Sequence, residues 1–330
     1  MQSFISKYKP ALIFGVIACV LMWFVSYVID FGVRHSDLEE TGKVNKIVNH
    51  EIDPDLIVFG SSVSQVGVDP CILNEKTNLS SYNCSINGTR FSQYKGLIDE
   101  FASYSKTNKY VVFVETFFSF EKVDALTAPE NFIPALDNRN VYNSLYEVQP
   151  GLIWKSRYVP FYKYIVVSYR YYKNSIIGWK RMIHPSINND PHKGYFPVDR
   201  KWEADADEAI RNTKPFTVQI DDSIVSKYIL TIQKLQARGQ KVFLVLTPMY
   251  NEMFKRVTDI SPVRELMNKI AATTGAVFLD YSHSQICDNK DFFYNSNHLN
   301  SMGAKVFSSQ LGDTLSSLIG NSNPVYRKLN

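Results

Sequence analysis

Several short apolar runs occur after residue 50, and polar residues or glycine bound each of them. Four are almost continuously apolar: 56–59, 110–114, 242–246 and 276–279. Residues 82–86 form a more mixed candidate of the same kind. Runs of this length without polar alternation predict buried strands. Because both faces of such strands are apolar, they predict a parallel sheet that is covered on both sides.

Segments with apolar residues at helical spacing alternate with these strands. They are 90–104, 224–235, 261–274 and 300–319. Asp222 or Ser223 is a suitable N-cap for the second segment, and Ser261 followed by Pro262 begins the third. Strands that alternate with amphipathic helices predict an α/β fold, in which functional side chains gather beyond the carboxyl ends of the strands.

The N-terminal segment is apolar in a different way. Residues 11–28 carry no charge, and a helix of that length crosses a bilayer core of about 30 Å. Lys7 and Lys9 precede it and acidic residues follow it, which predicts a cytoplasmic N-terminus and a periplasmic or cell-surface location for the rest. A cleaved signal peptide, a lipoprotein signal ending at Cys19 and a buried core helix are the alternatives. We expect an uncleaved anchor, since no A-x-A site ends the run and the residues after Cys19 stay apolar.

These patterns divide the chain. We expect residues 1–34 to form a cytoplasmic tip and a transmembrane anchor, 35–50 a polar stalk, and 51–330 the folded domain. Residues 120–220 interrupt the strand–helix alternation and are rich in Tyr, Trp, Lys and Arg, which predicts a mainly helical insertion. One interpretation is that its aromatic residues form a satellite core, a small second core that packs on the sheet. A lid, a glycan-binding surface, or a face docked on the membrane or a membrane partner is the alternative.

Composition narrows the functional classes. A hydrophobic content of 45% with 21% charged residues is typical of a globular protein. The net charge of +4 comes without a basic run, which argues against nucleic acid as a partner. A Cys71–Cys84 disulfide is allowed in an oxidising compartment. No Cys/His cluster has metal-ligand spacing, so we expect neither a metal nor another cofactor.

Two polar positions coincide with the place where the predicted topology gathers chemistry. Gly60-Ser61-Ser62 directly follows the first strand, where the N–H groups of a following helix can stabilise an anion. His298 precedes the last helix in the sequence Asn-Ser-Asn-His-Leu-Asn. Each feature alone is common on protein surfaces. Together, at these positions in the predicted topology, they are a much more specific signal than either is alone.

With these motifs the chain resembles the SGNH (GDSL-like) hydrolase superfamily over about residues 51–320. Gly60-Ser61-Ser62 is similar to the first family block, usually Gly-Asp-Ser, and His298 to the last, usually Asp-x-x-His. The resemblance implies that Ser62 is the nucleophile and that His298 is its base. Asn87-Gly88-Thr89 is similar to the second block. The resemblance implies a flavodoxin-like three-layer α/β/α fold with a parallel sheet. It also implies an oxyanion hole that contains the N–H groups of Ser62 and Gly88.

The Gly-Ser-Ser variant, the single anchor and the insertion resemble one membrane-anchored branch of that superfamily. Its members, among them the D-alanine-transfer protein of teichoic acid synthesis and the alginate acetylation factors, work in cell-envelope O-acylation. The resemblance implies an extracytoplasmic O-acyltransferase, expected to be O-acetyl, that acts on an envelope glycan acceptor. The donor is then a polytopic membrane-bound O-acyltransferase. An esterase with the same site and a catalytically inactive assembly subunit are the alternatives.

One departure from the family pattern concerns the oxyanion hole. The third block, Gly-x-Asn-Asp, is absent after the third strand, where residues 114–120 read Val-Glu-Thr-Phe-Phe-Ser-Phe. Thr116 or Ser119 remains as a candidate third donor. Losing one such donor costs about 10²–10³ in rate, so the hole should be weak toward general esters. Proteins of the membrane-anchored branch often lack this block too, so the resemblance implies that its absence argues against free hydrolysis more than against acyl transfer.

A second departure concerns the acid of the triad. Asn295 stands three residues before His298, where the family has aspartate. An asparagine can orient an imidazole but cannot offset the charge of an imidazolium, and replacing the acid costs about 10⁴ in turnover. We expect a Ser62–His298 dyad. Recruitment of Asp288 or Asp291, or the loss of catalysis, is the alternative.

Overall fold

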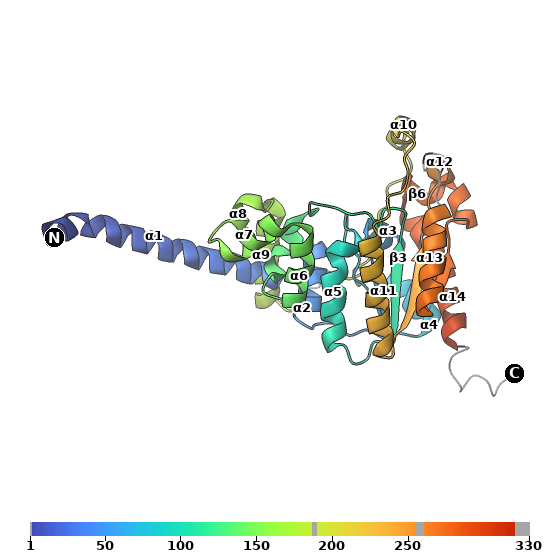
Figure 1. The fold of residues 1–330 in the computed structure, drawn as a ribbon, viewed down its shortest axis with the longest axis horizontal. Coiled ribbons are helices and arrows are strands. Elements are labelled where there is room, and N and C mark those ends of the chain that lie inside the picture. The colour runs from blue at the N-terminus through green and yellow to red at the C-terminus, as the bar shows by residue number, and fades with distance from the viewer. Residues whose placement is uncertain (1, 187–189, 255, 257–260, 321–330) are drawn as a thin grey trace.

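The apolar runs of the sequence assemble into one parallel sheet. The computed structural model describes residues 2–186, 190–254, 256 and 261–320 (Figure 1). Its central sheet has the strand order β2-β1-β3-β4-β5, and all neighbours are parallel. The strands are β1 Leu56–Gly60, β2 Ser81–Asn83, β3 Tyr110–Glu115, β4 Lys241–Leu246 and β5 Val277–Asp280. This order is the flavodoxin-like one, so the predicted α/β fold is confirmed.

Helices cover both faces of the sheet, which explains why the strands are apolar throughout. Ile57 and Phe113 face α5 (Phe91–Tyr104), α11 (Asp222–Ala237) and α13 (Ser261–Thr274). Val58 and Val112 face the opposite layer, which contains α4 (Pro70–Thr77) and α14 (Ser301–Gly320). Four of these helices correspond to the four helices that the apolar spacing predicts.

The second strand is shorter than the predicted 82–86. β2 ends at Asn83, but the chain remains beside β1, since the N–H groups of Cys84 and Ile86 donate to the carbonyl oxygens of Val58 and Gly60. Cys84 is buried in this stretch, and Cys71 and Cys84 are both free thiols. The disulfide that the sequence allows is not formed.

The insertion at about 120–220 is mainly helical, as predicted, in the part that the structure describes. Its helices are η1 Pro129–Asn131, η2 Ile133–Ala135, α6 Arg139–Val148, α7 Pro150–Tyr158, α8 Lys163–Val166, α9 Tyr169–Ile183 and α10 Ala204–Asn212. α6 packs on α5, and α9 packs on the N-terminal helix. Tyr171 is buried as a satellite core would require, whereas Trp154 and Tyr158 are each about half exposed, at 49% and 54%. The satellite core therefore accounts for only part of the aromatic content.

The N-terminal helix α1 (Gln2–Arg34) projects from the domain as a single rod (Figure 1). Its Tyr8–Arg34 stretch of 27 residues contains a window with a mean hydropathy of 2.6, and none of that window is buried. The helix is therefore long and apolar enough to cross a bilayer. A signal sequence has the same properties.

Residues 35–50 differ from the predicted polar stalk, because α2 (Glu39–Val48) is packed into the domain. Val44 and Ile47 are fully buried. Its polar side chains are buried as well, and they have partners: Lys43 Nζ donates to Ser85 O at 2.6 Å, and Asn45 Nδ2 donates to Val33 O at 2.7 Å. Buried polar groups that are hydrogen-bonded internally cannot be distinguished from solvated ones by sequence polarity, which explains the difference.

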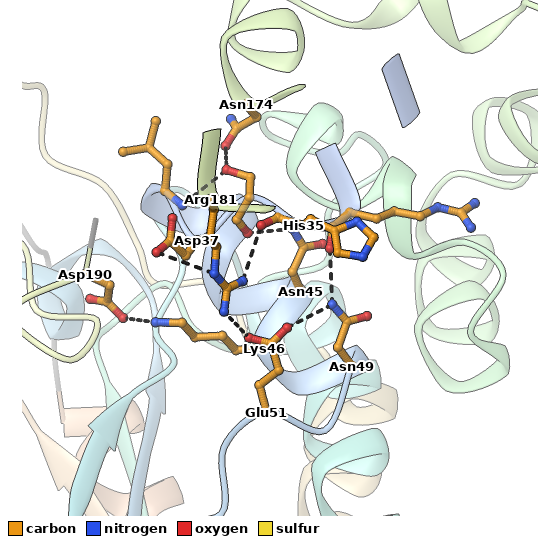
Figure 2. Close-up of polar contacts among 12 residues, drawn as sticks. His35, Asp37, Asn45, Lys46, Asn49, Glu51, Asn174, Arg181 and Asp190 are labelled. Atoms are coloured by element: carbon orange, nitrogen blue, oxygen red, sulfur yellow. Dashed lines mark hydrogen bonds and ion pairs between the residues drawn. The ribbon is translucent and has the colours of Figure 1, made fainter. Parts of the chain in front are cut away.

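Polar contacts fasten the end of α1 to α2 and α9 (Figure 2). Arg181 on α9 donates to Glu51 at 2.8 Å, and its Nε lies 3.9 Å from Asp37 Oδ2. Ser36 donates to Asn174 Oδ1 at 2.6 Å, and both residues are buried. Ion pairs and hydrogen bonds of this kind hold the three helices in one arrangement.

Close backbone contact between α1 and α9 completes this junction. A Cβ atom on Gly178 would lie 1.7 Å from the Gly32 oxygen, and one on Gly32 would lie 2.4 Å from the Ser175 oxygen. Trp179 Nε1 also donates to the Val28 oxygen at 2.9 Å. Two glycines at the crossing allow the helices to approach this closely. α1 therefore enters the domain through a packed helix crossing.

Candidate active site

Ser62 lies directly beyond the carboxyl end of β1, as the first residue of α3 (Ser62–Gly67). Its exposed fraction is 9%. β1 can end here beside β3 because residue 60 is glycine: a Cβ atom at that position would lie 2.5 Å from the Val114 oxygen. The glycine of the Gly-Ser-Ser motif thus has a packing role, and it brings the serine to the edge of the sheet.

Side chains at the end of β2 and just after it hold α3 in place behind Ser62. Asn83 Nδ2 donates to the carbonyl oxygens of Ser64 and Val68, both at 2.9 Å. Ser85 Oγ donates to Ser64 Oγ at 2.7 Å. These groups are all buried, so the hydrogen bonds fix the orientation of the short helix that carries Ser62.

His298 and Asn295 lie on either side of the two-residue turn of a hairpin. β6 (Phe293–Asn295) and β7 (His298–Leu299) are antiparallel, and Asn295 is paired with His298. Asn295 Oδ1 accepts the backbone N–H groups of Asn297 at 3.2 Å and of His298 at 2.9 Å. Since two N–H groups donate to this atom, it must be the carboxamide oxygen and not the nitrogen.

That identification fixes the tautomer of His298. The ring Nδ1 lies 3.0 Å from the same Asn295 oxygen, which can only accept, so Nδ1 carries the proton. Nε2 then has a free lone pair and lies 2.8 Å from Ser62 Oγ. The Ser62 hydroxyl donates to Nε2. This is the geometry that a general base needs to remove a proton from a serine nucleophile.

Contacts at the base of the hairpin hold His298 in this position. Asn300 Nδ2 donates to the Asp291 oxygen at 2.7 Å, and Asn300 Oδ1 accepts the Gly303 N–H at 3.0 Å. The Tyr294 ring stacks on the imidazole, with ring centroids 5.5 Å apart. The polar residues around His298 in the sequence thus tie the hairpin to α14.

The electrostatic environment of His298 is that of a neutral imidazole. Burial lowers the pKa of His298 from 6.5 to about 4. The acidic alternatives do not contact the ring: Asp288 is hydrogen-bonded to Asn251, and Asp291 is exposed. Asn295 occupies the position of the acid without its charge. An imidazolium at this position would therefore lack a carboxylate partner, as the predicted Ser62–His298 dyad would require.

A cleft of about 210 Å³ opens beside Ser62. Its lining comes from five parts of the chain: α2, α3, the loop after β2, the insertion, and β6. The residues are Glu39, Glu40, Ser62, Gln65, Val66, Asn87, Arg170, Phe196, Val198 and Tyr294. It is smaller than the roughly 300–1,000 Å³ pockets that take drug-sized ligands.

The charged residues that line this cleft do not belong to a sequence motif, so the sequence does not identify them as site residues. Gln65 Nε2 donates to Glu40 at 3.1 Å, and Lys173 lies 3.4 Å from Glu39. A hydrogen bond with Tyr169, together with the charges of Glu39 and Glu40, raises the pKa of Arg170. Glu39 has a positive φ of 51°, which is uncommon for a residue other than glycine. These residues come from the expected stalk and from the insertion, so only the tertiary fold brings them to Ser62.

The oxyanion candidates Gly88, Thr116 and Ser119 lie in two different turns. Gly88 lies in the turn after β2 with a φ of 73°, next to Asn87 in the cleft lining. Thr116 and Ser119 are buried in the turn after β3, where the Thr116 N–H donates to Ser119 Oγ at 3.0 Å. Gly88, Thr116 and Ser119 do not line the cleft. The Thr116 N–H is thus already engaged, while the roles of all three stay predictions.

Comparisons with known proteins bear mainly on the fold. No family model matches the chain, and no curated protein matches it. A structure described provisionally as a platelet activating factor from Streptococcus pneumonia is 11% identical, with a TM-score of 0.42, over 90% of this chain and 99% of its own. One described provisionally as a lipolytic protein of the G-D-S-L family from Desulfitobacterium hafniense DCB-2 is 9% identical, with a TM-score of 0.37, over 78% and 98%. Such distant likenesses carry no argument about chemistry. The solved structures that this chain is similar to thus include a G-D-S-L lipolytic protein, and its own fold is the three-layer parallel α/β arrangement described above.

Proposed function

We propose that the chain is a membrane-anchored serine O-acyltransferase of the SGNH type, with Ser62 as nucleophile and His298 as general base. One observation carries the proposal: the 2.8 Å contact between Ser62 Oγ and His298 Nε2, in the tautomer that Asn295 fixes. A serine hydroxyl that donates to an unprotonated imidazole at the carboxyl end of a parallel sheet is arranged for attack on an acyl carbonyl.

The reaction has two half-steps. Ser62 Oγ attacks the carbonyl carbon of the donor, its proton passes to His298 Nε2, and the leaving oxygen of the donor takes that proton as the C–O bond breaks. An acceptor hydroxyl then attacks the Ser62 ester. Its proton passes to Nε2 and returns to Ser62 Oγ when the acyl group leaves. The neutral state of His298, favoured by burial, allows it to accept a proton in each half-step.

Three features favour transfer of a short acyl group over general ester hydrolysis. The cleft of about 210 Å³ suits an acetyl group. Asn295 replaces the acid that a fast hydrolase uses. α1 suits a single-pass anchor with the domain outside the membrane, which would bring Ser62 close to a polytopic acyltransferase that supplies the acyl group. An envelope glycan is the proposed acceptor.

Labelling with a fluorophosphonate probe tests the nucleophile. The full chain in detergent should react with the probe, and the Ser62→Ala variant should not. Ser61→Ala is the matched control, since it removes the neighbouring hydroxyl and should label like the parent. Equal labelling of the parent and the Ser62→Ala variant would exclude Ser62, and no labelling of either would favour an assembly subunit.

A second experiment separates transfer from hydrolysis. p-Nitrophenyl acetate is supplied with and without an oligosaccharide, and the products are identified by mass spectrometry. Acetylated oligosaccharide that depends on Ser62 supports the proposal. Free acetate as the exclusive product, at every oligosaccharide concentration, would make the chain an esterase.

A further inference from the structure

The side of the insertion next to α1 has features that the proposed chemistry does not use. α9 packs on the last turns of α1, and α7 and α8 lie beside them, where α1 enters the domain (Figure 1). Large apolar side chains on this side are exposed, including Trp154 at 49%, Tyr158 at 54% and Ile165 at 81%. Apolar groups gathered in this way beside a membrane-type helix mark an interaction surface.

The level of this surface follows from the helix geometry. Residues 10–29 carry no charge, and 20 residues at 1.5 Å each span about 30 Å, the thickness of a bilayer core. Asp30 is the first charged residue after that run. With α1 in a membrane, as the proposed function assumes, the turn from Ser26 to Asp30 lies at the level of the lipid headgroups. Because the Gly32–Gly178 crossing is tight, α7–α9 are held at that level too.

A cleft of about 300 Å³ lies at this level, between α1 and the loop that joins α7 to α8. Trp23, Tyr27 and Asp30 line it from α1. Arg157, Tyr158 and Lys163 line it from the insertion. Aromatic and basic side chains that lie together at the end of an apolar helix are typical of a membrane–water interface.

Two basic side chains line this cleft, and their surroundings differ. Asp30 is paired with Lys163, and it also accepts the hydroxyl groups of Tyr164 at 2.9 Å and Tyr171 at 2.7 Å. Within the part of the chain that the structure describes, Arg157 forms no ion pair with a carboxylate. Its guanidinium lies over the Tyr142 ring, 4.6 Å from the centroid. A guanidinium held in this way presents several donors to a phosphate.

From this arrangement we infer that the cleft between α1 and the α7–α8 loop binds the headgroup of an anionic phospholipid. Arg157 contacts the phosphate, and the exposed rings of Trp154 and Tyr158 lie at the level of the glycerol and upper acyl chains. The inference rests on the membrane anchor of the proposed function but not on its chemistry, so Ser62→Ala leaves lipid binding unchanged.

Tryptophan fluorescence in membranes tests the surface. The full chain is reconstituted into phosphatidylcholine vesicles with an equal part of phosphatidylglycerol, either lipid being brominated near the glycerol. Two single-tryptophan variants are compared, one keeping Trp154 and the other keeping Trp202, with the remaining three tryptophans changed to phenylalanine. Trp202 precedes α10, which lies far from α1 (Figure 1). Quenching of Trp154 but not of Trp202 is expected.

A comparison of two lipid headgroups tests whether the cleft binds an anionic one. Brominated phosphatidylglycerol should quench Trp154 more than brominated phosphatidylcholine does, and Arg157→Gln should remove this difference. Lys234→Gln on α11 loses the same charge away from α1 and should keep it. Inorganic phosphate added at a concentration equal to that of the lipid should not compete, which distinguishes a lipid headgroup from free phosphate.

Three outcomes would overturn the inference. Trp154 quenched no more than Trp202 would mean that lipid does not reach this surface, which then faces solvent or a protein. Equal quenching by both brominated lipids would mean that the surface touches the membrane without a headgroup site. Loss of quenching in the Ser62→Ala background would tie the effect to the active site. Thermal melts of each variant show whether it is folded.

Discussion

Asn295 presents its carboxamide oxygen to His298 twice, to the backbone N–H at 2.9 Å and to the ring Nδ1 at 3.0 Å. One side chain therefore closes the hairpin turn and selects the tautomer of the base. An aspartate would accept the same bonds and would add a negative charge beside the ring. The geometry of a triad is thus present while its electrostatic contribution is missing.

Restoring that charge should accelerate the reaction of Ser62 with a fluorophosphonate probe. In Asn295→Asp the carboxylate stabilises the imidazolium, which raises the pKa of His298 from its value of about 4. We expect at least a roughly tenfold faster rate of Ser62 labelling, given that the reverse change costs about 10⁴ in a serine triad. Asn297→Asp adds the same charge two residues away and serves as the control. An unchanged rate in Asn295→Asp would show that proton removal by His298 does not limit acylation.

The low pKa of His298 predicts an unusual pH profile. A base must be unprotonated, so labelling should be lost as pH falls through about 4 and should stay constant from pH 5 upward. In Asn295→Asp the acid limb should move to higher pH, because the carboxylate favours the protonated ring. The rate of labelling measured between pH 3 and 8 checks both expectations. An acid limb near 6.5 in the parent chain would contradict the burial of the ring.

The second family block can be tested with a matched pair of glycines. Gly88 and Gly275 have φ angles of 73° and 75°, so alanine strains either position, at a cost of about 1–2 kcal/mol. A Cβ on Gly88 would also lie 2.7 Å from Thr127 Cγ2, whereas one on Gly275 would meet nothing within 4 Å. We expect both variants to lower the melting temperature, but Gly88→Ala alone to slow the labelling of Ser62. Equal labelling rates would place the Gly88 N–H outside the oxyanion hole.

The crossing of α1 and α9 predicts a large effect of a small substitution. In Gly178→Ala the new methyl group would lie 1.7 Å from the Gly32 oxygen, so the helices must separate, at a cost of about 1–3 kcal/mol. Thermal unfolding in detergent should show a lower melting temperature. Gly151→Ala on α7 adds a methyl group that meets nothing within 4 Å, and it should leave the melting temperature equal or higher. A stable Gly178→Ala variant would mean that the junction is loose.

The sequence predicts those parts of this fold that depend on local patterns. The strand around Val58 and the helix around Tyr228 bury their side chains through apolar runs and helical spacing, which can be read without a structure. Ser62 and His298 can be identified from the sequence because Ser62 follows an apolar strand in a short motif and His298 precedes an amphipathic helix in another. The roles assigned to them remain predictions, although the structure brings the two side chains together.

Other parts depend on contacts between distant segments. Lys43 and Asn45 make α2 look solvated, yet their partners, Ser85 and Val33, lie on other elements. Arg170 reaches the cleft from the insertion, more than a hundred residues from Ser62 in the chain. Polarity in a sequence does not reveal whether water or another segment satisfies a hydrogen bond.

The burial of α2 has a practical consequence for anyone who wishes to separate the anchor from the domain. A soluble fragment that begins at residue 51 would lack Val44 and Ile47, both fully buried, and would expose the apolar surface beneath them. It would also lose Glu39 and Glu40, which form one wall of the cleft beside Ser62. A unit that also keeps the crossing of α1 with α9 must begin before Val28, within the apolar helix itself.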